Sequence, residues 1–304
     1  MTPWLILKRE LRDLLSLWLV PGLAAFLPWR WCVHLYWWLA GTGLLLREEV
    51  SGSRGGRRML GLPPDDPAFD RRFRFGFLLE HADLFRALGR GWRGLAATMP
   101  VVRDAASPPA GGLCFFYSFN QGLPAMAALR AAGYKVWMVY RSLPGRPPGA
   151  GWLRYAYMRL RVRMVTVVSG NPGIATGGAR ERIATAVAAG GLVFLAADSP
   201  PRPGTGVVPM RFPDGRQGWW RSGGPRLALE LTGERYSVRV RIDWKARERS
   251  AQLRLLPPTE DLRELVTQLN LEFCENFAEQ PELWFHWPGP QGFFQFPEGA
   301  RPDL

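Results

Sequence analysis

The sequence predicts an α/β protein with a central, mostly parallel β-sheet flanked by helices. Short apolar runs alternate with helix-like segments from residue 112 onward. Runs such as VWMVY and LVFLA are apolar without alternation, which is typical of strands buried on both faces. The chain has 304 residues, 47% of them hydrophobic, and is therefore long enough to bury a substantial core. We divide it into an N-terminal apolar membrane-associating segment, residues 1–50, and an α/β domain, residues 51–304.

The expected elements follow from composition and periodicity. Strands, recognised as short apolar or β-branched runs, are expected at 112–117, 136–141, 164–169, 191–197, 236–243 and 252–256. Helices, recognised by an apolar face, are expected at 76–95, 124–132, 151–161, 174–189, 223–232 and 259–279. Residues 51–75 are rich in Gly, Pro and Arg, and they predict a polar boundary between the two regions.

The N-terminal segment indicates an apolar membrane anchor. Residues 14–29 and 31–46 contain no Asp, Glu, Lys or Arg, and Arg30 separates them. Each run is shorter than the roughly 20 residues that a spanning helix needs, and Pro21 and Pro28 interrupt the first. The dense aromatic residues with flanking Arg favour an anchor, either interfacial or a tilted span through Arg30. A buried helical hairpin is the alternative.

The net charge of +13 predicts an anionic partner. The span from Ala105 to Arg180 contains no Asp or Glu, although it carries many Arg residues. An anionic membrane surface, an acidic carrier protein and nucleic acid all fit this charge. We find no nucleic-acid recognition motif, so we expect no nucleic-acid partner. The three Cys are isolated and only three His occur, so we expect neither a metal site nor a cofactor.

One stretch, FFYSFNQGLPAM, reads as a buried strand that runs into a polar turn and then a helix. Ser118, Asn120 and Gln121 lie in this turn, which contains no His, Asp, Glu or Lys. Catalytic groups commonly occupy such turns, so the absence of a charged side chain needs an explanation.

Four blocks occur in a characteristic order: FFYSFNQGLPAMAALRAAGYKVWMVYR, WLRYAYMRLRVR, AAGGLVFLAADSPPRPGTGVVPMRF and PELWFHWPGP. Over residues 5–295 this order resembles the late acyltransferases of lipid A biosynthesis, within the lysophospholipid acyltransferase superfamily. The resemblance implies transfer of an acyl chain from acyl carrier protein or coenzyme A to a hydroxyl of a membrane lipid. It also implies a location at the cytoplasmic face of a bacterial inner membrane.

Individual residues carry the resemblance. Asp198, Gly206 and Pro209 match the family's third block, and His286 matches its Trp-x-x-His-Arg-Arg pattern, in which Trp287 and Pro288 replace the two Arg here. The substrate-binding residues implied by the resemblance and by the polar turn are Asn120, Gln121, Arg159, Arg161 and Gly206. Arg159 and Arg161 resemble a pair of Arg on a family helix.

The family's catalytic motif is absent. It is His-x4-Asp/Glu, in which the His removes the acceptor proton and the carboxylate orients the His. Aligned on the strand, its two positions are Ser118 and Leu123, which cannot perform these roles. Five residues after the three His of the chain stand Leu39, Arg86 and Gln291, so no shift of register restores the motif.

Two replacements are conceivable. Ser118, Asp198 and His286 occur in the chain order of an α/β-hydrolase triad, although no Gly-x-Ser-x-Gly elbow surrounds the serine. Cys114 is a second candidate nucleophile, although an apolar strand raises the pKa of a thiol. Two functions therefore stay open: an acyltransferase, or a non-catalytic relative that binds lipid, an acyl carrier or a partner enzyme.

Overall fold

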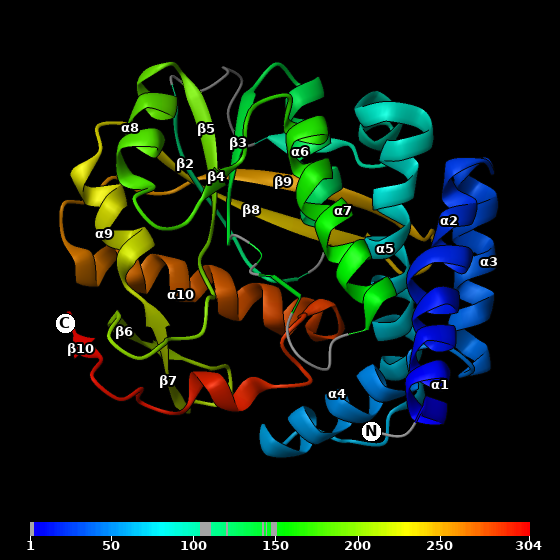
Figure 1. Ribbon diagram of the computed structural model, residues 1–304. Helices are drawn as coiled ribbons and strands as arrows, with labels where there is room; N and C mark the ends of the chain where they lie inside the picture. The colour runs from blue at the N-terminus through cyan, green and yellow to red at the C-terminus, as the bar shows by residue number, and fades with distance from the viewer. Residues whose placement is uncertain (1–2, 104–110, 120, 142, 144, 147–150) are drawn as a thin grey trace.

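The computed structural model describes residues 3–103, 111–119, 121–141, 143, 145–146 and 151–304. A large sheet lies at the centre of the molecule, and the N-terminal helices stand together along one side (Figure 1). A smaller sheet lies near the C-terminus, beside the long helix α10 (Leu262–Glu279). The predicted α/β class with a mostly parallel central sheet is confirmed.

The main sheet contains seven strands within the described residues, in the order β1-β9-β8-β2-β5-β3-β4. Every neighbouring pair is parallel except β8 and β9, which are antiparallel. The strands are β1 (Val101–Arg103), β2 (Gly112–Phe116), β3 (Lys135–Tyr140), β4 (Ile174–Ala175), β5 (Gly191–Ala196), β8 (Glu234–Asp243) and β9 (Glu248–Leu255). Because β2, β5 and β3 are parallel, their carboxyl ends meet at one edge, where such sheets place their ligands.

The chain leaves β5 at that edge and next forms the first two strands of the smaller sheet. Its strands are β6 (Gly206–Arg211), β7 (Gln217–Arg221) and β10 (Arg301–Pro302). β6 is antiparallel to β7 and parallel to β10.

The main sheet is buried on both faces, as its unbroken apolar runs predict. Along β2, Leu113 and Phe115 belong to one core cluster, whereas Cys114 belongs to the other. The first cluster includes residues of α8 (Arg180–Ala188), α9 (Gly223–Glu230) and α10. The second includes residues of α6 (Gly122–Ala131) and α7 (Trp152–Ser169).

The N-terminal region is mainly helical, and most of its helices pack on α5 (Pro67–Ala96). It comprises α1 (Pro3–Asp13), the π-helical turn η1 (Leu14–Leu19), α2 (Val20–Gly22), η2 (Leu23–Ala25), α3 (Trp29–Thr42) and α4 (Arg47–Met59). The expected boundary between residues 50 and 51 falls inside α4. Among the residues that the structure describes, we find no helix long and apolar enough to cross a membrane, so the expected tilted span is not supported.

Three expectations for local structure were wrong. Residues 164–169 form the last turns of α7 rather than a strand, because Met164, Val165 and Val168 share one buried helical face. The expected helix 174–189 begins only at Arg180, since Gly177 and Gly178 adopt positive φ angles of 91° and 67°.

The expected polar boundary at 51–75 instead contains most of α4 and the start of α5. Gly56 allows close packing there, because a Cβ at this position would lie 2.0 Å from the carbonyl oxygen of Trp287. Two short helices, η3 (Pro281–Leu283) and η4 (Pro290–Phe293), flank that tryptophan near the C-terminus.

Candidate functional site

Ser118 and Asp198 meet at the carboxyl edge of the main sheet. Phe116 of β2 lies opposite Ala196 of β5. Ser118 comes two positions after Phe116, and Asp198 comes two positions after Ala196. The Ser118 backbone N–H donates to both carboxylate oxygens of Asp198, at 2.8 and 2.9 Å. The Ser118 hydroxyl donates to Oδ1 of Asp198 at 3.0 Å. Two residues that are 80 positions apart in sequence therefore form one hydrogen-bonded unit.

Asp198 is fully buried and its oxygens are occupied. Besides the Ser118 bonds, Oδ2 accepts the indole N–H of Trp284 at 3.1 Å. The backbone N–H of Phe285 in turn donates to the Ser118 carbonyl at 2.5 Å. A buried carboxylate that accepts several N–H bonds holds backbone segments in place. We call Ser118, Asp198 and Trp284 the aspartate clamp.

His286 lies beside this clamp without entering it. Its ring packs against those of Trp284 and Phe293, with centroids 5.7 and 5.1 Å apart. Burial lowers the pKa of His286, and the charge of Asp198 partly opposes that shift. Within the described part of the chain, no hydrogen bond joins its ring to Ser118 or Asp198. The structure thus brings the predicted Ser118 and Asp198 together, but Asp198 binds the serine directly and no imidazole lies between them.

Gln121, expected to bind substrate, faces the protein interior. It precedes α6 with a φ of 66°, a left-handed conformation that is uncommon for a side chain other than Gly. Its backbone N–H donates to the carboxylate of Glu80, and its side-chain N–H donates to the Gly76 carbonyl at 3.3 Å. Its side-chain oxygen accepts from Arg249. Asn120 lies outside the described residues.

A set of paired charges on and around α5 supports the other side of the turn. We call it the α5 network: Glu80, Asp83, Arg161 and Arg249. Arg249 binds both oxygens of Asp83, at 2.5 and 2.8 Å, and Arg161 pairs with Glu80. Burial raises the pKa of Asp83 to about 6, although Arg249 opposes the shift. Sequence reasoning missed Glu80, Asp83 and Arg249; two acids within the apolar run of α5 were the available signal.

His81 adjoins this network as a neutral side chain. Its Nδ1 lies 2.8 Å from the hydroxyl of Tyr157 on α7. Burial, and then the charges of Arg161 and Arg154, lower the pKa of His81 to about 3. The imidazole is therefore uncharged near pH 7 and serves the packing of α5 on α7.

The other predicted substrate-binding residues, Arg159, Arg161 and Gly206, do not form one site. Arg161 points to Glu80, whereas Arg159 is exposed, as expected for two positions that do not share a helix face. Gly206 allows close packing: a Cβ there would lie 2.3 Å from a carboxylate oxygen of Asp303 and 2.4 Å from the Ser222 hydroxyl.

Leu123 is buried in the core cluster that contains residues of α6 and α7. Cys114 is fully buried in the middle of β2, and burial raises the pKa of its thiol well above the usual value. Neither residue is placed to act chemically on a ligand.

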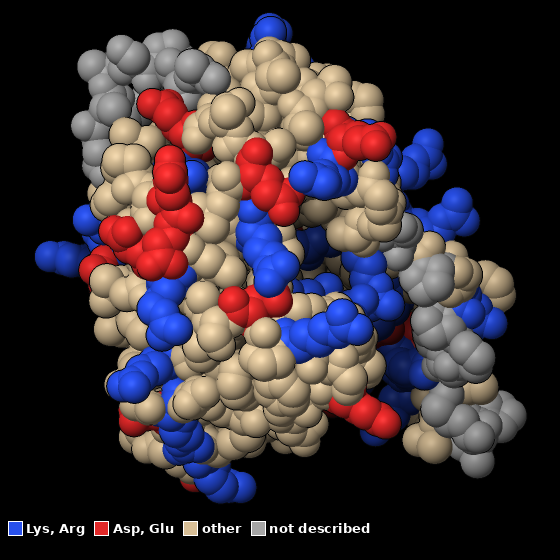
Figure 2. Space-filling view, turned by 90° about the vertical axis from the view of Figure 1, so that its left-hand side faces the viewer, with Lys and Arg blue, Asp and Glu red and all other residues tan. Residues whose placement is uncertain are grey.

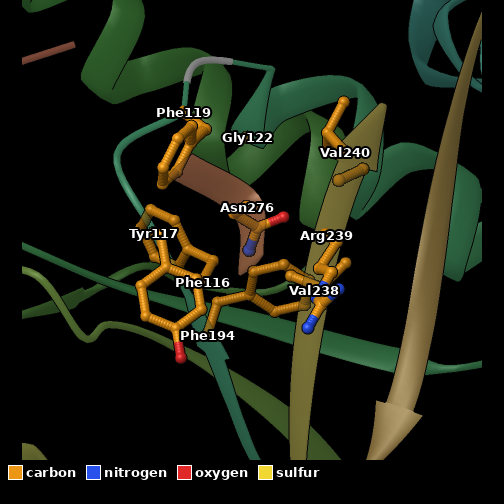
Figure 3. Close-up of a pocket in the computed structure, with 10 residues that line it drawn as sticks. Phe116, Tyr117, Phe119, Gly122, Phe194, Val238, Arg239, Val240 and Asn276 are labelled. Carbon is orange, nitrogen blue, oxygen red and sulfur yellow. The ribbon is translucent and has the colours of Figure 1, made fainter. Parts of the chain in front are cut away.

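The cavity beside the turn is aromatic and very small. Figure 3 shows Phe116, Tyr117 and Phe119 from the β2 end of the turn, Val238 and Val240 from β8, and Asn276 from α10 around it. Its volume is ≈ 10 Å³, room for about one water molecule. A larger cleft of ≈ 960 Å³ lies between α3 and the β8–β9 hairpin, and Arg249 lines it.

No protein-family model and no curated protein sequence matches this chain. No group of three or more His, Cys, Asp or Glu that could hold a metal ion occurs among the described residues.

Proposed function

We propose that this chain is a membrane-associated, acyltransferase-like protein that binds an acyl chain from acyl carrier protein or coenzyme A, or its lipid acceptor, without the family's general-base chemistry. The observation that carries the proposal is the aspartate clamp. At the position of the family's base, a serine hydroxyl donates to a buried carboxylate that already accepts from two N–H groups, those of the Ser118 backbone and the Trp284 indole. Losing a positioned general base typically slows a reaction about 10²–10⁴-fold.

The N-terminal helices support attachment to a membrane surface. On α1, Trp4, Leu7 and Leu11 follow helical spacing and are 69%, 59% and 55% exposed. On α3, Trp31 and Trp38 lie two turns apart and are 70% and 62% exposed. Exposed apolar stripes on helices next to basic residues are typical of proteins that lie in the interface of an anionic bilayer. In this proposal the bilayer is the cytoplasmic face of a bacterial inner membrane.

The catalytic question is tested with acyl thioesters. Purified protein is mixed with radiolabelled acyl coenzyme A or acyl carrier protein and membrane lipids, and both bound and transferred label are measured. We expect saturable binding, with transfer no faster than the protein-free background in wild type, Ser118→Ala and Asp198→Asn. Transfer above background that either substitution abolishes would show that the clamp is catalytic, and absence of any thioester or lipid binding would remove the proposal.

Membrane attachment is tested with vesicles. The Leu7→Glu variant should bind vesicles of anionic phospholipid at least about 10-fold more weakly, because it places a charge on the apolar face of α1. Leu271→Glu is the matched control, since Leu271 is 59% exposed on α10, away from this face. Equal binding by the two variants would refute the assigned surface.

A further inference from the structure

Three arginines from different elements gather at the carboxyl edge of the main sheet. Arg141 follows β3, Arg202 lies in the loop after β5, and Arg221 ends β7. Since β3 and β5 are parallel neighbours, their last residues reach the same edge. The Nε–H of Arg221 donates to the Pro200 carbonyl at 2.9 Å and so fixes this side chain against the β5 loop.

These arginines, which we call the arginine cluster, lack acidic partners. Within the part of the chain that the structure describes, no ion pair joins any of them to a carboxylate. The neighbouring Arg226 is instead paired with Asp303 at 2.5 Å. Cations left together without an acid repel one another, so their grouping lowers stability unless an anion binds.

The pKa values of Arg221 and Arg202 are consistent with repulsion between the three arginines. The pKa of Arg221 is lowered to about 10, first by burial and then by the charges of Arg202 and Arg141. Burial and the charge of Arg141 likewise lower the pKa of Arg202. An anion within hydrogen-bond reach of these groups would reverse the effect of the like charges.

The surroundings suit a ligand. Figure 2 shows the face that carries α8, α9 and β10, on which many Lys and Arg side chains are exposed, with Asp and Glu side chains among them. Helix α9 begins directly after Arg221, with Ser222 as its N-cap and the N–H groups of Gly223 and Gly224 in its first turn. No described residue accepts a hydrogen bond from those two N–H groups, which adds donors next to the cluster.

The aspartate clamp lies next to this cluster. The backbone N–H of Arg221 points to the carbonyl of Ser199, the residue after Asp198, with an N···O distance of 3.4 Å. The strand that carries Arg221 is thus joined to the segment that carries Asp198.

We propose that Arg141, Arg202 and Arg221 form a binding site for a phosphoryl group. Guanidinium groups bind phosphate oxygens through paired N–H donors, and several of them match the two negative charges of a phosphate monoester. Coenzyme A and phosphatidic acid carry a phosphate monoester, whereas the phosphopantetheine of an acyl carrier and most other anionic phospholipids carry a phosphodiester with one negative charge. Which of these ligands the site takes rests on the proposed function; the phosphoryl site itself rests on the arginine cluster.

The test measures binding of three phosphate-bearing probes to the full chain by calorimetry at constant ionic strength. The probes are inorganic phosphate, coenzyme A and vesicles of phosphatidic acid in phosphatidylcholine. We expect Arg141→Gln/Arg202→Gln to weaken the binding of the preferred probe at least about 10-fold. Tighter binding of coenzyme A than of the vesicles indicates that the site takes the phosphate of coenzyme A or of an acyl carrier. Tighter binding of the vesicles indicates that it takes a lipid headgroup.

The matched control is Arg263→Gln, because Arg263 is an exposed arginine at the start of α10. It should change affinity by less than about 2-fold. An equal loss in Arg263→Gln, or no binding of any probe by wild type, overturns the inference. Binding of an acyl pantetheine, which has no phosphate, tests the proposed function separately, so failure of one proposal is distinguishable from failure of the other.

Discussion

The α5 network and the arginine cluster treat the same kind of side chain in opposite ways. In the α5 network every arginine meets a carboxylate, and Arg249 and Asp83 are almost completely buried. In the arginine cluster three cations stand together at an edge of the sheet, and no described carboxylate forms an ion pair with any of them. The paired, buried charges hold elements of the fold together, whereas we propose that the arginines without an acidic partner bind a ligand. The two regions lie on either side of the Ser118 turn, which the aspartate clamp fixes in place.

The largest effect should follow from breaking the buried pair. In Arg249→Met the Asp83 carboxylate stays buried without its partner, which typically costs about 3–5 kcal/mol of unfolding free energy. Denaturant unfolding measures the loss. Arg241→Met is the control, because Arg241 pairs with Glu279 at the surface and exposed pairs contribute about 1 kcal/mol or less. A similar small loss in both variants would show that the α5 network is not structural.

A charge introduced on the α6 side of the turn should be nearly as harmful. Leu123 is 4% exposed and packs in the core, so Leu123→Glu buries a carboxyl group without a partner at a cost of about 3 kcal/mol. Leu123→Met keeps the volume and should cost less than about 1.5 kcal/mol. Both are measured by denaturant unfolding. Equal stability of the two variants would show that this position can hold a carboxyl group and does not depend on apolar packing.

The third prediction concerns the contribution of His81 to the pH dependence of the unfolding free energy. Its pKa is about 3 in the folded protein and about 6.5 in the unfolded chain, so the unfolded chain binds more protons between these values. Stability therefore falls as the pH is lowered through 6.5 toward 3. Between pH 7.5 and pH 5 wild type should lose about 2 kcal/mol relative to His81→Gln, measured by denaturant unfolding at each pH. Parallel curves for the two proteins would mean that His81 is already accessible to protons.

Sequence patterns predicted the sheet better than the site, and the reason is physical. An apolar run such as LVFLA records burial on both faces directly, so β2, β3 and β5 were predicted nearly at their true positions. Their parallel register also explains why Ser118 and Asp198 meet. The π-helical turn, α4 and the extended α7 were missed, because tertiary packing overrides local composition there.

The site depends on long-range pairing that a single sequence does not record. The partner of Asp83 is 166 positions away, and the partner of Asp198 is 80 positions away. An acid-free span between Ala105 and Arg180 did indicate a basic surface, and Arg141 comes from it. The other two members of the arginine cluster lie outside that span, so only the fold brings the three together.

The smallest expected change in unfolding free energy belongs to the arginine cluster, and it best distinguishes this cluster from the α5 network. Replacing Arg141 and Arg202 by Gln removes like-charge repulsion and no described ion pair, so the unfolding free energy without ligand should stay within about 0.5 kcal/mol of wild type or rise. Denaturant unfolding in chloride buffer measures this value, and adding phosphate should stabilise wild type more than the variant. Loss of more than about 1 kcal/mol in chloride would mean that the two arginines hold the fold together, as Arg249 does. A stable variant that no longer responds to phosphate would separate the two regions by role, because one set of arginines would then support folding and the other would bind a ligand.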